Sequence, residues 1–196
     1  MRDSTSAEWA DLTRLERELL GLHKHGFNCL RQGLLSADGR IAVRAGYLLG
    51  EFPFNVEAAL ATDRPLLTRF LVHRWWGLLL YRVPLVHYQD KFLQQYQRKI
   101  VALDKEAVPF LLRALEENDE GCSVFKSGAS PEMHICTAVI QMLAEIGDAR
   151  AVAPLQRIAA GRPNWHRYLI EDAERALERI QAAQRKAAAD ADKPLP

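Results

Sequence analysis

The chain has 196 residues, of which 48% are hydrophobic and 26% are charged, and its formal net charge is +1. This length suits one domain or one short repeat array, with a core that needs no disulfides or metals to stabilise it. The nearly neutral charge excludes a global electrostatic attraction to nucleic acid or membranes.

The cysteines and the first twelve residues indicate the cellular compartment of the protein. Cys29, Cys122 and Cys136 are widely spaced and odd in number, so they form neither a disulfide framework nor a paired-cysteine metal motif. The first twelve residues lack the apolar core of a signal peptide. Both features predict a cytoplasmic protein.

Residues 66–86 are apolar enough to raise the question of a membrane span. The window also contains four basic or imidazole side chains, Arg69, His73, Arg74 and Arg82. A charge near the bilayer centre costs about 2.5–3.5 kcal/mol, and several such costs outweigh the leucines. We therefore expect a buried helix and no transmembrane segment.

Helical periodicity dominates the chain, and no run alternates with the period of two that marks a strand. The pattern therefore predicts an all-α protein. In chain order, helices are expected over 7–22, 27–35, 40–50, 56–61, 65–82, 84–103, 105–116, 131–146 and 149–160, and from 165 into the alanine-rich region. Asn55, Asp104, Asp148 and Asn164 are the expected N-caps, and Gly161 is expected to end a helix.

An internal repeat appears when residues 91–115 are shifted by 44 positions onto 135–159. The shift matches a capping aspartate, an Ala-Val start, a buried leucine and an arginine. The matched pairs are Gln97 and Gln141, Asp104 and Asp148, Ala107 and Ala151, Val108 and Val152, Leu111 and Leu155, and Arg113 and Arg157. The clearest repeats span 88–117 and 131–161.

The motif EIGDARAVAPLQ at 145–156 resembles a HEAT-like repeat of the phycobilisome-lyase type. The resemblance implies a short α-solenoid of antiparallel helix pairs, with Arg113 and Arg157 at equivalent positions of a concave surface. The first third of the chain has no clean repeat, so its N-terminal part would be degenerate. We expect one domain over 1–186 and a disordered tail over 187–196.

The segment 64–99 combines positive charge with aromatic rings. It contains seven Lys or Arg residues, one acid and seven aromatic residues. Such a segment could bind a protein or stack on unpaired bases, or its aromatics could simply fill the core. The helical spacing predicts that Trp75 is buried and that Trp76 is exposed beside positive charge.

Other chemical signals are weaker. The loop 118–130 is long for a helix connection and could contribute to binding. Cys122 could act as a nucleophile with His134 as its base, and His23, His25 and Cys29 could ligate a metal. No further residue completes either site, so we predict no catalytic residue, no metal and no cofactor.

The sequence favours a non-enzymatic adaptor, scaffold or inhibitor-type protein that binds another protein through a helical-repeat surface. The candidate binding residues are Arg69, His73, Arg74, Trp76, Arg113 and Arg157. A nucleic-acid-binding protein that uses segment 64–99 is one alternative. A bilin-lyase-like protein, which the repeat resemblance alone implies, is the other.

Overall fold

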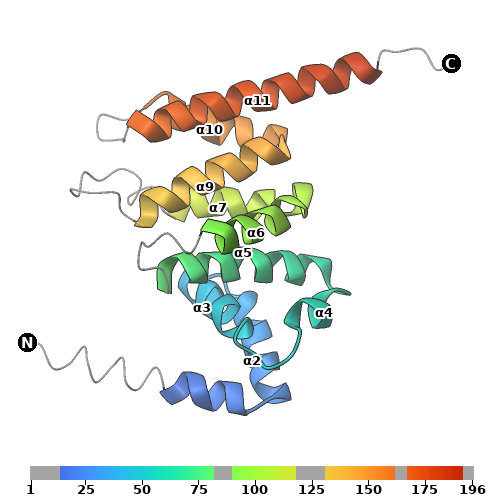
Figure 1. The fold of residues 1–196 in the computed structure, drawn as a ribbon, viewed down its shortest axis with the longest axis vertical. Coiled ribbons are helices and arrows are strands. Elements are labelled where there is room, and N and C mark those ends of the chain that lie inside the picture. The colour runs from blue at the N-terminus through green and yellow to red at the C-terminus, as the bar shows by residue number, and fades with distance from the viewer. Residues whose placement is uncertain (1–13, 82–89, 118–130, 162–166, 192–196) are drawn as a thin grey trace, which may run out of the picture. The chain divides into compact units, whose positions relative to one another are not determined.

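The computed structural model describes residues 14–81, 90–117, 131–161 and 167–191. Within these ranges every regular element is a helix (Figure 1), which confirms the all-α prediction. No helix in the described ranges is both long enough and apolar enough to cross a membrane. The chain forms two compact units, Met1–Val83 and Pro84–Pro196, and each is treated by itself below.

The first unit begins with a helical stretch over 14–21, followed by four labelled helices. These are α2 (Lys24–Leu34), α3 (Gly39–Leu49), α4 (Val56–Leu60) and α5 (Arg64–Tyr81). Asp38 caps α3 by accepting a hydrogen bond from the Arg40 amide, and Asn55 caps α4 by accepting one from the Ala58 amide. The predicted cap at Asn55 is thus confirmed.

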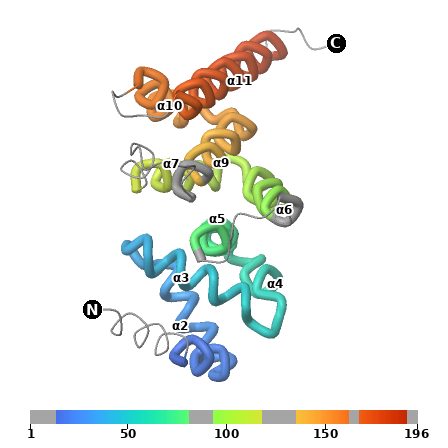
Figure 2. Tube along the Cα trace, turned by 60° about the vertical axis from the view of Figure 1, so that its left-hand side comes forward, coloured from blue at the N-terminus to red at the C-terminus, as the bar shows by residue number. Residues whose placement is uncertain are grey.

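Helix α3 lies between α2 and α5 in both views (Figures 1 and 2). Small residues let α3 and α5 approach closely. A β-carbon added to Gly46 would lie 2.8 Å from the main-chain nitrogen of Arg74, and one added to Gly77 would lie 2.6 Å from the β-carbon of Tyr47. At these two glycines the main chain of each helix therefore packs directly against the other helix.

Helix α5 has no single apolar stripe, and buried residues cover most of its circumference. Phe70 and Leu71 are buried together with the adjacent Trp75 and Trp76. A helix of this kind is a core helix and not a surface helix with one apolar stripe. The prediction that residues 66–86 include a buried helix is confirmed over the described part of that range.

The second unit contains α6 (Asp90–Val101), α7 (Val108–Glu117), α9 (Pro131–Ile146), α10 (Val152–Ala159) and α11 (Arg167–Ala191). Short 3₁₀ turns, η1 (Asp104–Glu106) and η2 (Ala149–Ala151), precede α7 and α10. Helix α9 packs against both α7 and α11 (Figures 1 and 2). Its buried residues include Ile135, Val139 and Leu143.

The 44-residue repeat corresponds to equivalent local structure. Helices α7 and α10 begin at the matched residues Val108 and Val152, each after a 3₁₀ turn. Leu111 and Leu155 are both fully buried. The matched segments thus use the same turn and the same core position.

The two matched aspartates differ. Asp148 is buried and caps η2 by accepting a hydrogen bond of 2.8 Å from the Arg150 amide, as predicted. Asp104 is exposed, has a φ of 52° and is the first residue of η1, whose N-cap is Leu103 without a side-chain bond. The predicted cap at Asp104 is therefore wrong, because its main chain adopts the left-handed conformation instead of the extended one that a cap needs.

Helix α11 continues to Ala191, which is five residues into the predicted disordered tail over 187–196. The side chains of 181–190 are exposed, so packing does not hold this end in place. Alanine-rich sequence extends a helix whose nucleation is already complete. The expectation of disorder over 187–191 is corrected accordingly, and 192–196 lie outside the described residues.

Candidate functional site

Arg74, a predicted binding residue, is buried within the first unit and is 8% exposed. Its guanidinium donates to the carbonyl oxygen of Tyr47 at 2.5 Å and to the Glu51 carboxylate at 3.3 and 3.4 Å. The same guanidinium lies 5.7 Å from the centre of the Tyr47 ring. Arg74 thus ties α5 to the end of α3, and its predicted role as a surface anchor is corrected.

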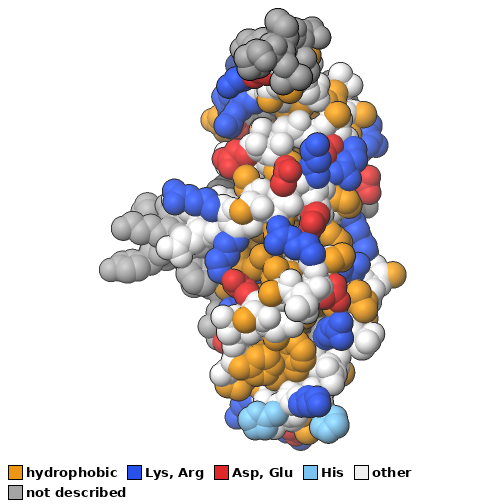
Figure 3. Space-filling model, turned by 90° about the vertical axis from the view of Figure 1, so that its right-hand side faces the viewer, with side chains coloured by type: hydrophobic (Ala, Val, Ile, Leu, Met, Phe, Trp, Pro, Cys, Tyr) orange, Lys and Arg blue, Asp and Glu red, His pale blue; other side chains and the backbone are white. Residues whose placement is uncertain are grey.

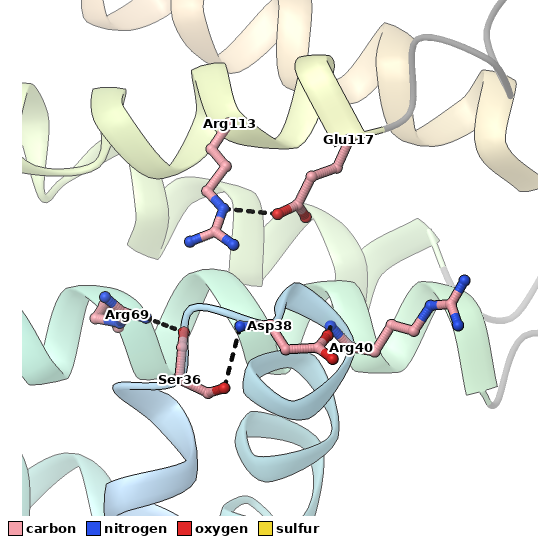
Figure 4. A network of polar contacts seen from close by, with 6 residues as sticks. All are labelled: Ser36, Asp38, Arg40, Arg69, Arg113 and Glu117. Carbon is pink, nitrogen blue, oxygen red and sulfur yellow. Dashed lines mark hydrogen bonds and ion pairs between the residues drawn. The ribbon is translucent and has the colours of Figure 1, made fainter.

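Arg69 also makes an internal contact. Its guanidinium donates at 3.1 Å to the carbonyl oxygen of Ser36, in the turn between α2 and α3 (Figure 4). The Ser36 hydroxyl in turn accepts from the Asp38 amide at 3.1 Å. His73 is half-buried and lies where α5 meets Gly46 of α3. Arg69 therefore helps to hold α5 against the turn between α2 and α3, and the binding role of both residues stays a prediction.

Trp76 was expected to be exposed but is only 4% exposed. The expectation is wrong because it assumed a single buried stripe on α5, whereas the helix is buried on most sides. Trp75 is fully buried, as predicted, and the two indole rings meet edge to face at 6.0 Å. Within the described part of the chain, neither indole N–H has a hydrogen-bond partner, so both are buried donors without an acceptor there.

The repeat-matched arginines of the second unit differ in their surroundings. Arg113 is half-buried and forms an ion pair of 2.6 Å with Glu117, one turn further along α7 (Figure 4). Arg157 is exposed on α10. The role of both arginines in a concave binding surface stays a prediction.

The nucleic-acid alternative depends on segment 64–99, which is described only in part. Residues 82–89 lie outside the described ranges. Of the aromatics that are described, Phe70, Trp75, Trp76 and Tyr96 are all buried and so offer no face to a base. The described part of this segment therefore supports a structural role for its rings.

A surface that the sequence reasoning missed is a cluster of three phenylalanines in the first unit. Phe27 on α2 meets Phe52 and Phe54 from the loop between α3 and α4, and the ring centroids are 5.2–6.1 Å apart. Phe52 is buried, Phe27 is half-buried, and Phe54 is 43% exposed. We call these three residues the phenylalanine cluster.

Figure 3 shows hydrophobic side chains gathered near the lower end of the view, with histidine side chains below them. Gly26 makes the cluster possible, because a β-carbon there would lie 2.1 Å from the Leu19 carbonyl oxygen and 3.3 Å from the Phe52 ring. The signal in the sequence was the Phe52-Pro53-Phe54 run in a short loop, where aromatic residues are not needed to make a turn.

A second feature is a shallow groove of about 260 Å³ between α9 and α11. Its lining residues are Ile140, Gln141, Ala144, Glu145, Asp172, Arg175, Ala176 and Arg179. Arg175 donates to Asp172 at 2.5 Å, and this hydrogen bond raises the pKa of Arg175. Two arginines and two acids balance each other at the rim, so the groove selects no ligand charge.

The proposed metal and nucleophile residues gain no support. Among the described residues, no three His, Cys, Asp or Glu side chains lie close enough to hold a metal ion. Cys122 and the loop 118–130 lie outside the described ranges, and nothing is described of the His134 side chain.

The cysteines differ from expectation in one respect. Cys29 is exposed and free, whereas Cys136 is buried on α9 and disulfide-bonded. The sequence predicted no disulfide framework, and the cysteine spacing did not indicate the disulfide at Cys136. The cytoplasmic location, which depended partly on that cysteine pattern, stays a prediction.

No protein-family model, curated protein or solved structure matches this chain.

Proposed function

We propose that this chain is a non-enzymatic protein-binding module whose contact surface is the phenylalanine cluster. The observation that supports this most directly is Phe54, a large aromatic side chain that is 43% exposed although two neighbouring rings hold it in place. Aromatic residues contribute strongly to protein interfaces because they bury a large area with few rotatable bonds.

The cluster is also pre-organised for binding. Phe27 belongs to an 11-residue helix, and the loop that carries Phe52 and Phe54 is fixed between α3 and the capped start of α4. A partner would therefore meet rings whose positions are already restricted, which lowers the entropic cost of association.

We further propose that the second unit consists of HEAT-like repeats that serve as a scaffold. The 44-residue repeat, with its matched helix starts at Val108 and Val152 and its matched buried leucines, supports this proposal. Proteins built from stacked helix pairs commonly act through extended surfaces. A bilin-lyase role depends on the sequence resemblance alone.

Affinity purification from lysate of the native host, with and without nuclease, tests the protein-binding proposal. The wild-type chain is compared with Phe54→Ser and with Ile41→Ser, a matched loss of another exposed apolar side chain of the first unit (52% exposed). We expect one stoichiometric protein that survives nuclease, is lost with Phe54→Ser and is retained with Ile41→Ser. Retention by Phe54→Ser, or loss of all bound material on nuclease treatment, would contradict the proposal.

A further inference from the structure

We infer that the phenylalanine cluster binds a peptide segment of a partner protein in which acidic residues flank an apolar side chain. This inference depends on the proposed protein-binding function and adds the chemical class of the partner. It follows from the charges that surround the cluster.

The first observation is the charge of α2, the helix that carries Phe27. This helix contains Lys24, His25 and Arg31 and no acidic residue. Lys24 is exposed and stands three residues before Phe27, so the two side chains lie on the same face of the helix. A partner whose apolar side chain covers Phe27 would bring its flanking residues next to this ammonium group.

The second observation is that acids near the cluster are already engaged. Glu51, which directly precedes Phe52, accepts from Arg74. Asp63 accepts from Arg31 at 3.1 Å. Glu57 is half-buried in the first turn of α4, where the helix dipole favours a negative charge. With Glu51 and Asp63 paired and Glu57 half-buried, Lys24 is the exposed charge that lies on the same face of α2 as Phe27.

A partner peptide fits these observations better than a membrane surface. Recognition of anionic lipids uses clusters of about four to eight Lys or Arg residues. The phenylalanine cluster has Lys24 beside it, and Arg31 is already paired with Asp63. Rings fixed edge to face against one another also favour a shaped apolar side chain over the disordered interior of a lipid layer.

The test begins with a random peptide library displayed on phage and selected in parallel on the full wild-type chain and on Phe54→Ser. Peptides enriched on the wild-type chain alone should carry an aromatic or aliphatic residue with Asp or Glu beside it. Fluorescence anisotropy with one such synthetic peptide then measures the effect of Lys24→Glu. We expect a loss of affinity of about two- to fivefold, the range of an exposed ion pair.

A charge swap makes the test sharper. The same peptide with its acids changed to lysine should bind Lys24→Glu better than it binds the wild-type chain. Lys105→Glu, at an exposed lysine of η1 in the second unit, is the control and should behave as wild type. Restored binding in the swapped pair supports the inference directly, because a purely structural effect of Lys24 would not be reversed by the peptide.

The outcomes separate this inference from the proposed function. Peptides that depend on Phe54 but show no acidic preference, or show no response to Lys24→Glu, would overturn the acidic class and leave protein binding intact. Absence of any Phe54-dependent peptide would overturn both. Phe54-dependent sedimentation with phosphatidylserine vesicles, or Phe54-dependent self-association in gel filtration, would assign the surface to a membrane or to a second copy and would also overturn the inference.

Discussion

The guanidinium of Arg74 on α5 donates a hydrogen bond of 2.5 Å to the carbonyl oxygen of Tyr47, two residues before the end of α3. The last carbonyl groups of a helix have no partner within the helix, and they form its negative end. Arg74 therefore supplies both a donor and a positive charge to the end of α3. Glu51, whose side chain is 29% exposed, balances that charge at 3.3 Å, so the three residues form one partly buried polar unit.

Replacing Arg74 by alanine should destabilise the protein strongly. The change removes the donor to the Tyr47 carbonyl and the positive charge beside the Glu51 carboxylate, and the loss of hydrogen bonds that involve a charged group costs about 1.5–3 kcal/mol. Urea denaturation followed by circular dichroism should show a lower midpoint. Arg40→Ala, at an exposed arginine of α3, is the matched control and should change the free energy of unfolding by about 0.5 kcal/mol or less. Equal effects of the two changes would contradict the assignment.

Gly50 and Arg74 should be energetically coupled. A β-carbon at Gly50 would lie 1.8 Å from the central carbon of the Arg74 guanidinium, although the Gly50 main chain (φ −72°) would accept alanine. Gly50→Ala should therefore displace the guanidinium and cost about 2 kcal/mol in the wild-type chain. In the Arg74→Ala background the same change should cost much less. A double-mutant cycle measures this coupling, and additive effects would contradict it.

The hydrogen bond between Arg74 and the Tyr47 carbonyl explains why sequence analysis predicted, wrongly, that Arg74 lies at the surface. Periodicity identified the helix around it and the burial of Trp75 beside it. Whether an arginine on such a helix meets solvent depends on what faces it, and the acceptor here is a main-chain carbonyl 27 residues earlier in the chain. No local pattern encodes that pairing.

Trp76 should contribute to stability and not primarily to binding. Its side chain is as enclosed as a core residue, so Trp76→Ala should lower the free energy of unfolding by about 3–5 kcal/mol. Leu80→Ala on the same helix, at a side chain that is 42% exposed, should cost about 1 kcal/mol or less. Denaturant midpoints of the two variants provide the comparison. A mild effect of Trp76→Ala would mean that the ring lies at the surface after all.

Features that depend on neighbouring residues could be predicted from the sequence, whereas features that depend on residues far apart in the chain could not. Asn55 and Asp148 cap as the sequence predicted, because a cap needs only the next two or three amides. Asp104 shares the same motif but adopts positive φ, and the motif alone does not distinguish the two. The phenylalanine cluster depends on α2 meeting a loop 25 or more residues later, so periodicity could not have assembled it.

Asp148 should make stability depend on pH below about 4. The hydrogen bond from the Arg150 side chain, aided by the Arg150 amide and by nearby positive charge, holds the pKa of Asp148 below its usual value of 3.8. The pKa of Asp148 is therefore lower in the folded state than in the unfolded state. At pH values above the unfolded-state pKa, the charged carboxylate makes its full contribution to stability. That contribution is lost as the pH falls through the folded pKa.

The stability difference between wild type and Asp148→Asn should therefore be largest near neutral pH and should shrink below about pH 4. Asparagine retains the capping oxygen, whereas Asp148→Ala removes it and should cost a further ~1 kcal/mol at every pH. Asp104→Asn, at the repeat-matched aspartate without a capping bond, should leave stability at neutral pH nearly unchanged, because asparagine tolerates its positive φ equally well. Urea denaturation of the four proteins from pH 3 to 7 measures all three differences, and a difference for Asp148→Asn that grows on acidification would show that the carboxylate destabilises the fold.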